Sequence, residues 1–242
     1  MLCLQNGVEN ETVLAGVLGE DKVIAGTVTS AIGRRAAGDI LLERKRGLGV
    51  YSGHALSQHL LEGLNRAGLN AQGYPSTAGM KWSKMLTNLL ANATSAILAL
   101  PPDAIFADPR LFQIEIRQLR EALAVMSALR IPVTDLPGTP VRALALAVRS
   151  LPLAVSRPFL RKAVGGGRGG KMPSFYLDLH SGRGKSEVDF LNGAVTRFGK
   201  QAGIATPVNS RLNAIMQELV DGRLPVDAYA GQADKLLQRM TS

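Results

Sequence analysis

Short apolar runs separated by turn signals characterise the first part of the chain, a pattern typical of β-strands. Residues 1–4 are apolar and end at the turn signal Asn6-Gly7. Further strands are predicted by apolar and β-branched runs at residues 22–32, 39–43, 47–51 and 69–71. The short separations between the first three of these runs predict an antiparallel meander. Helical spacing of apolar residues is confined here to residues 11–18 and 54–67.

From Ser76 onward the apolar positions follow the helical period almost throughout. Helices are predicted at residues 77–99, 109–129, 140–150, 186–203, 209–222 and 226–240. Residues 151–170 show no regular period and are expected to be irregular. The change of pattern places a domain boundary near residues 72–75, so the predicted domains are 1–73 and 74–242.

One predicted helix combines an apolar surface with a regular polar row, Lys84, Asn88 and Asn92. Residues four apart on a helix lie one above another, so one ammonium and two carboxamides would share a narrow strip. A helix this apolar is expected to be buried, and buried polar groups need partners. The partner could be another element, ordered water or a ligand. A lysine that extends to solvent and asparagines that cap carbonyls remain the alternative.

A glycine-rich run formally matches the dinucleotide-binding pattern G-x-G-x-x-G through Gly165, Gly167 and Gly170. Its context differs from that of a dinucleotide site, because no strong strand precedes it and Pro173 follows where a helix should begin. A flexible loop is the favoured interpretation, and such a loop could move over a site. Farther along, Ser186 is expected to cap a helix, and Gly193 within that helix suggests that another backbone or helix approaches closely.

Composition indicates a globular chain, since 46% of its 242 residues are hydrophobic. Cys3 is the only cysteine, which excludes an internal disulfide and fits a reducing compartment. The three histidines and this cysteine form no cluster with metal-ligand spacing, so no metal is expected. No apolar run reaches the length of a membrane span, and the amino-terminal residues do not resemble a secretory signal. A cytoplasmic location without membrane association is therefore expected.

The net charge of +9 could serve nucleic acid, a membrane surface or small anions. The basic residues are scattered, and only 5% of the residues are aromatic. No nucleic-acid-binding signature is present, so a nucleic-acid partner is not expected. An anionic small molecule explains the excess charge equally well.

Four blocks in order carry a resemblance to a known family, namely LQNG at residues 4–7, KWSKMLTNLLANATSAI at 81–97, PSFYLDLHSGRGKSEVDFLNGAV at 173–195 and GIATPVNSRL at 203–212. The chain resembles ketopantoate reductase, the NADPH-dependent 2-dehydropantoate 2-reductase family of pantothenate biosynthesis. The implied fold is an α/β remnant with the last strands of a Rossmann-like sheet, followed by an all-α domain like the C-terminal domain of 6-phosphogluconate dehydrogenase.

The resemblance also implies roles for six residues. Lys84 corresponds to the general acid of the family, and Glu187 to the carboxylate that binds the substrate hydroxyl and orders the site, so both are expected to be catalytic. The implied substrate-binding residues are Asn88, Asn92 and Ser174, and Asn6 lies beside the cofactor. The reaction is addition of hydride from NADPH to the C2 ketone of ketopantoate. An ammonium suits it because negative charge develops on the former carbonyl oxygen.

Two departures from the family pattern matter. The spacing between Ser174 and the acidic residue is one residue longer than the common form. The chain also begins at LQNG, whereas this motif in the family follows a glycine-rich dinucleotide-binding half. A truncated reductase for a 2-keto acid is therefore expected, and the alternative is a non-catalytic helical dimerisation or binding domain derived from one. A homodimer formed through the helical domain is a further expectation from the resemblance.

Overall fold

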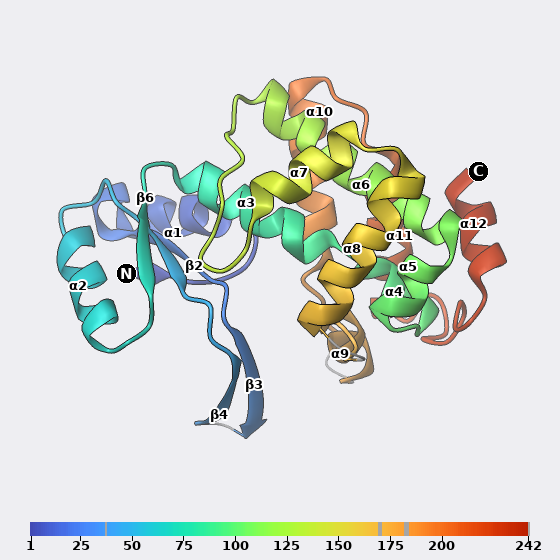
Figure 1. The fold of residues 1–242 in the computed structure, drawn as a ribbon, viewed down its shortest axis with the longest axis horizontal. Helices are drawn as coiled ribbons and strands as arrows, with labels where there is room; N and C mark the ends of the chain where they lie inside the picture. The colour runs from blue at the N-terminus through green and yellow to red at the C-terminus, as the bar shows by residue number, and fades with distance from the viewer. Residues whose placement is uncertain (37, 169–170, 182–183, 242) are drawn as a thin grey trace. The chain divides into compact units, whose positions relative to one another are not determined.

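The computed structural model describes residues 1–36, 38–168, 171–181 and 184–241. The chain forms two compact units (Figure 1). The first unit contains residues 1–85 and 131–142, and the second contains residues 86–130 and 143–242. The predicted domain limits, 1–73 and 74–242, remain a prediction about the chain's domains.

The first unit is built on a mixed four-stranded sheet with the order β1-β2-β5-β6. Its strands are β1 (Leu2–Cys3), β2 (Ile24–Val28), β5 (Leu48–Tyr51) and β6 (Ala71–Tyr74). The pairs β1–β2 and β5–β6 are parallel, and β2–β5 is antiparallel. Gly47 precedes β5 with φ of 147°, and a Cβ there would lie 2.3 Å from the Asn70 carbonyl oxygen, so only glycine fits this approach.

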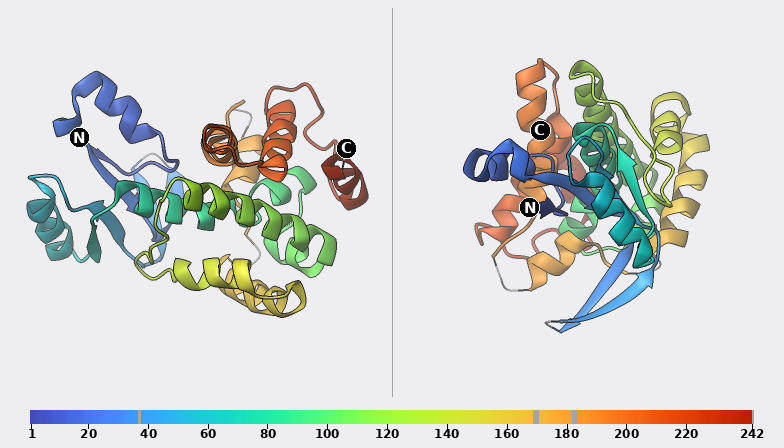
Figure 2. Two further views of the ribbon diagram at one scale, coloured as in Figure 1. Left: turned by 90° about the horizontal axis from the view of Figure 1, so that it is seen from above. Right: turned by 90° about the vertical axis from the view of Figure 1, so that its left-hand side faces the viewer.

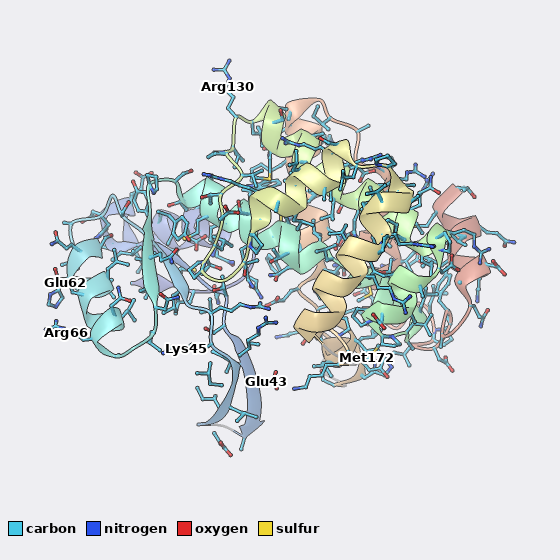
Figure 3. The ribbon with its side chains drawn as sticks, in the orientation of Figure 1. Glu43, Lys45, Glu62, Arg66, Arg130 and Met172 are labelled. Carbon is cyan, nitrogen blue, oxygen red and sulfur yellow. The ribbon has the colours of Figure 1, made fainter. Side chains whose placement is uncertain are left out.

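Short helices accompany the sheet. They are α1 (Asn10–Leu18), the 3₁₀ turn η1 (Glu20–Lys22) and α2 (Ser57–Arg66). Helix α2 packs on β5 and β6, and the side chains of Glu62 and Arg66 point away from the sheet (Figure 3). The segment 131–142 belongs to the same unit, because the Thr29 hydroxyl donates to the Pro137 carbonyl at 2.9 Å. The predicted helices at 11–18 and 54–67 are confirmed, the second with a later start.

The predicted strand at 22–32 is wrong as a single element, and so is the meander. The run divides into β2 and β3 (Ala31–Ala36), and β3 pairs with β4 (Asp39–Arg44) as a separate two-stranded sheet. This β3–β4 hairpin projects away from the main sheet in Figure 1 and in the right-hand view of Figure 2. Burial explains the division, because Ile24 is 3% exposed whereas Ile32 is 50% exposed.

Substitution of Leu42 by lysine in the β3–β4 hairpin is expected to leave stability nearly unchanged. Leu42 is 53% exposed, so little apolar contact is lost, and the change should stay within about 0.5 kcal/mol. Denaturant unfolding of the two proteins measures the difference. A loss above about 1.5 kcal/mol would show that this side chain is covered in solution.

The helix predicted at 77–99 is interrupted, which corrects the idea of one polar strip. Helix α3 runs from Thr77 to Leu89, and α4 runs from Ala93 to Leu98. Between them Ala91 has φ of 47°, a left-handed conformation that cannot continue a right-handed helix. Asn92 consequently occupies the junction before α4 instead of a third position on α3.

The second unit is helical. After α4 it contains α5 (Pro102–Ala107), α6 (Pro109–Ala128), α7 (Val141–Ser150), α8 (Leu153–Arg168), α9 (Ser174–His180), the π-helical turn η2 (Asp189–Gly193), α10 (Ala194–Ala202), α11 (Pro207–Val220) and α12 (Ala233–Thr241). Helix α6 packs against α5, α8, α10, α11 and α12. Phe106 and Phe112 lie in its core with ring centroids 5.6 Å apart.

Residues 153–168 correct a second expectation, because they form α8 and not an irregular segment. Ser156 and Leu160, four positions apart, are both buried, and α8 packs on α5. Packing of one face therefore outweighs the poor helix propensity of Pro158 and the glycines. Gly165 and Gly167 lie in the last turns of α8, which excludes the expected loop there, whereas Gly170 lies outside the described residues. The helix predicted at 226–240 is also too long, because the helix in this stretch, α12, begins only at Ala233.

Candidate active site

The junction between α3 and α4 is held by a buried carboxylate on α6. Glu115 is fully buried and accepts hydrogen bonds from the Ala91 amide at 2.6 Å and the Thr94 hydroxyl at 2.5 Å. The Gln118 carboxamide, one turn farther along α6, donates to Glu115 at 2.7 Å. Charge-assisted hydrogen bonds of this kind satisfy a carboxylate that would otherwise be costly to bury.

Asn92 and Ser174, two of the expected substrate-binding residues, meet at the start of α9. The Asn92 carboxamide donates to the Ser174 hydroxyl at 3.3 Å and accepts from the Phe175 backbone amide at 3.1 Å. Asn92 is buried and Ser174 is exposed. The expectation that another polar group lies opposite Asn92 is therefore confirmed, and that group is the amino-terminal turn of α9. Ser174 is the first residue of α9 and follows its N-cap, Pro173.

A second buried cluster of amides joins α6 to the π-helical turn and to α11. The Asn192 carboxamide donates to the Gln118 side-chain oxygen at 3.1 Å and to the Asn209 side-chain oxygen at 3.0 Å. Asn209 donates in turn to the Gln118 backbone carbonyl at 2.9 Å and to Glu121 at 2.7 Å. Gln118 and Asn209 each have a defined orientation, because both the nitrogen and the oxygen of their carboxamides are used by neighbours.

Glu187, the second expected catalytic residue, lies in the turn that leads into η2 and is half-buried. The preceding Ser186 hydroxyl accepts from the Val188 amide at 3.2 Å, which agrees with its expected capping role. The close approach expected at Gly193 is made by a side chain, because a Cβ there would lie 2.3 Å from the Asp189 carboxylate. Asp189 pairs with Arg197 at 3.0 Å. π-Helical turns of this kind occur frequently at functional sites.

Lys84 and Asn6 belong to the first unit, and Asn88 belongs to the second. Lys84 and Asn88 are carried by α3 and are both half-buried. Asn6 follows the carboxyl end of β1, and its carbonyl accepts from the Asn10 carboxamide at 2.5 Å. Asn10 is the first residue of α1. The roles expected for Lys84, Asn88 and Asn6 remain predictions.

Lys81 anchors the Asn6 segment on α3. Its ammonium is 3% exposed and donates to the Gln5 carbonyl at 2.5 Å and the Gly26 carbonyl at 3.2 Å. The same ammonium lies 2.8 Å from the Glu11 carboxylate on α1. This ion pair therefore ties the turn that contains Asn6 to the helix that carries Lys84.

Glu115, Gln118 and Lys81 are not among the residues predicted for the site, although the sequence holds a signal for the first two. Both lie on the apolar face of α6 among buried residues such as Phe112 and Leu119. Polar residues at such positions must have internal partners, so they mark a buried network. No comparable signal identifies Lys81, because its partners come from three separate segments.

Glu121 should make stability depend on pH. Burial raises the pKa of its carboxyl from 4.5, and hydrogen bonds from Val208 and Asn209 oppose this shift. Because the folded chain holds this proton more tightly than the unfolded chain, the contribution to stability is complete below pH 4.5. It is lost as the pH rises through the pKa of the folded state. We expect the unfolding free energy of wild type relative to Glu121→Gln to be larger below pH 4.5 than at neutral pH, measured by denaturant unfolding; a constant difference would contradict the shift.

Two kinds of feature are absent from the described residues. No group of three or more His, Cys, Asp or Glu residues in this part of the chain is arranged to hold a metal ion. None of the described helices has the length and apolar character required to span a bilayer.

Comparison with known proteins identifies the family. The model of the ketopantoate reductase PanE/ApbA C-terminal region matches residues 77–220. The 2-dehydropantoate 2-reductase of Pyrobaculum aerophilum is 28% identical over 168 residues, which are 69% of this chain and 52% of that protein. The Pyrococcus horikoshii protein of the same name is 24% identical over 224 residues, 90% of this chain and 66% of that protein. The chain thus spans between about half and two thirds of the length of these relatives.

Solved structures show the same fold. The PanE/ApbA family ketopantoate reductase from Ralstonia eutropha JMP134 superposes with a TM-score of 0.75 at 24% identity, covering 92% of this chain and 67% of that one. D-Mandelate dehydrogenase in complex with NADH gives a TM-score of 0.73 at 21% identity, covering 92% of this chain and 76% of that one. These neighbours confirm the predicted combination of a small sheet and a helical domain. The chain belongs to the ketopantoate reductase family, because the family model matches more than half of the chain's residues.

Proposed function

We propose that this chain supplies the catalytic and substrate-binding residues of a reductase that transfers hydride from NADPH to the C2 ketone of ketopantoate. The observation that carries this proposal is the family match, because residues 77–220 include Lys84, Asn88, Asn92, Ser174 and Glu187. The contact between the Asn92 and Ser174 side chains supports it further. These two polar groups, one at the α3–α4 junction and one at the start of α9, meet within the second unit.

The cofactor part of the proposal rests on the position of Asn6. It follows the carboxyl end of β1, which is parallel to β2, and ligands of open α/β sheets bind at this edge. The residues at 165–168 do not serve as a pyrophosphate loop, because they lie within α8. Asn6 would therefore hold the nicotinamide end of a dinucleotide, which supplies the hydride when bound. A neighbour in complex with NADH makes the choice between NADH and NADPH part of the test.

The residue types agree with reduction of a 2-keto acid. In the proposed mechanism the Lys84 ammonium donates a hydrogen bond to the ketone oxygen and then transfers its proton as negative charge develops there. Asn88, Asn92 and Ser174 orient the substrate without adding net charge, since amides and hydroxyls both donate and accept. Glu187 accepts a hydrogen bond from the substrate hydroxyl. The net positive charge of the chain also favours binding of an anionic substrate such as a 2-keto acid.

Location and assembly complete the proposal. A cytoplasmic location fits the single, buried Cys3, because cytosolic proteins rarely use disulfides. Pantothenate biosynthesis is the implied pathway, and a homodimer is the proposed assembly. Neither nucleic acid nor a membrane is among the proposed partners.

Binding and turnover by the purified chain test this function. Binding of NADPH and of NADH is measured by titration calorimetry. Turnover is measured as the loss of NADPH absorbance with ketopantoate or with benzoylformate, the 2-keto acid that corresponds to mandelate. Consumption of NADPH that requires ketopantoate is the expected result. A chain that binds neither dinucleotide and consumes none would contradict the proposal and favour the alternative, a non-catalytic helical dimerisation or binding domain.

A further inference from the structure

The α3–α4 junction is conformationally unfavourable by itself, and hydrogen bonds from α6 stabilise it. Ala91 in the left-handed conformation is less stable than in a helix by about 1–2 kcal/mol. A helix end also leaves backbone groups without helical partners. Side chains of α6 provide partners for a backbone amide and a backbone carbonyl at this junction. Glu115 accepts from the Ala91 amide, and Gln118 donates to the Leu89 carbonyl at 3.2 Å. The junction is therefore specified by two side chains far away in the sequence.

The position of Asn92 depends directly on this junction. Asn92 is the residue after Ala91, and its backbone carbonyl accepts from Ala96 in the first turn of α4. A change in the conformation of Ala91 would rotate the Asn92 side chain relative to α9. Its hydrogen bonds to Ser174 and Phe175 would then be lost, so Glu115 sets the geometry of this pair without contacting it.

The same two α6 side chains reach the turn that follows Glu187. Gln118 uses its amide nitrogen on Glu115 and Leu89, and its oxygen on Asn192. Asn192 lies in η2, the π-helical turn that begins two residues after Glu187. A continuous chain of buried hydrogen bonds thus runs from the Ala91 amide through Glu115 and Gln118 to η2.

We propose that Glu115 and Gln118 are positioning residues that hold Asn92 and the Glu187-bearing turn in register for the substrate. This assignment rests on the proposed function for its catalytic consequence. It separates these side chains from ordinary core residues, because apolar groups of the same size would fill the space without fixing Ala91. Buried polar groups of this kind specify one arrangement of the packed elements.

The first test measures local order and needs no activity. In Glu115→Gln the acceptor of the Ala91 amide loses its negative charge, and a neutral carboxamide oxygen accepts more weakly than a carboxylate. We expect amide hydrogen exchange at Ala91, followed by NMR, to accelerate at least about tenfold more than exchange at Leu119 in the middle of α6. The side-chain amide signals of Asn92 should shift toward those of a solvated asparagine.

The matched control is Thr94→Val, which removes another donor to the same carboxylate but keeps the Ala91 contact. In this variant exchange at Ala91 should change only in parallel with that at Leu119. Parallel changes in Glu115→Gln as well would overturn the positioning role. If Glu115→Gln does not fold, Glu115→Asp, which retracts the carboxylate by one methylene group, provides the same comparison.

The second test measures the substrate. Glu115→Gln and Gln118→Met are expected to raise KM for ketopantoate about tenfold with little change in KM for NADPH, because an orienting contact is lost. Local loosening without any effect on ketopantoate KM in an active enzyme would overturn the catalytic consequence. Absence of reductase activity in the wild type would instead contradict the proposed function and leave the hydrogen-exchange result to stand alone.

Discussion

Replacement of Lys84 by alanine is expected to lower kcat/KM for ketopantoate reduction by at least about a hundredfold. The proposed role of Lys84 is to donate a proton to the oxygen on which charge develops during hydride transfer. An alanine supplies neither the charge nor the proton. Steady-state kinetics with varied ketopantoate at saturating NADPH measures the loss, and kcat should fall with kcat/KM because the contact strengthens in the transition state.

Two comparisons make this result specific. Lys84→Met keeps the length and apolar stem of the half-buried side chain, so it should lose as much activity as alanine while perturbing packing less. Lys200→Ala changes an exposed lysine on α10 and should leave kcat/KM near the wild-type value. A Lys84→Met enzyme that retained a near-normal rate would remove Lys84 from the role of general acid.

Local signals allowed much of the helical part to be predicted. The Asp108-Pro109 pair predicts the start of α6, and the Asp108 carboxylate indeed accepts from the Arg110 amide at 2.8 Å. Gly203 ends α10 with φ of 69°, as a C-terminal glycine should. These signals work because a cap and its partners lie within a few residues of each other.

Features set by distant residues escaped prediction. No glycine or proline marks the end of α3 in the sequence. The break depends instead on Glu115, which lies 24 residues from Ala91 and accepts a hydrogen bond from its amide. The sequence alone therefore predicts one continuous polar strip on this helix. Likewise α8 looks irregular by propensity, and only its packing on α5 makes it helical. In both cases tertiary contacts override the local preference.

The candidate site shows the same division. The family resemblance selects Asn92 and Ser174 although 82 positions separate them, and the structure places their side chains 3.3 Å apart. The groups that hold this pair are absent from the resemblance. Glu115 and Gln118 could be found only by asking why polar residues occupy the apolar face of α6. Prediction therefore reaches the residues expected to contact the substrate more readily than those that orient them.

Replacement of Lys81 by methionine is expected to destabilise the first unit by about 3–5 kcal/mol, the cost of leaving a buried charge without its partner. Methionine fills the space of the lysine stem, but the Glu11 carboxylate loses the ammonium at 2.8 Å. The Gln5 and Gly26 carbonyls lose their donor at the same time. Denaturant unfolding measures the change, and Lys200→Met, at an exposed position, should stay within about 0.5 kcal/mol of wild type.

The double variant Lys81→Met/Glu11→Leu distinguishes a lost ion pair from lost packing. If the unpaired Glu11 charge causes the destabilisation, its removal should recover most of the stability, because apolar replacement of both partners is often nearly neutral. A double variant as unstable as Lys81→Met would show that the two carbonyl contacts dominate. Since Gln5 precedes Asn6, that outcome would make Lys81 chiefly an anchor of the Asn6 turn, and cofactor affinity would then fall equally in the single and double variants.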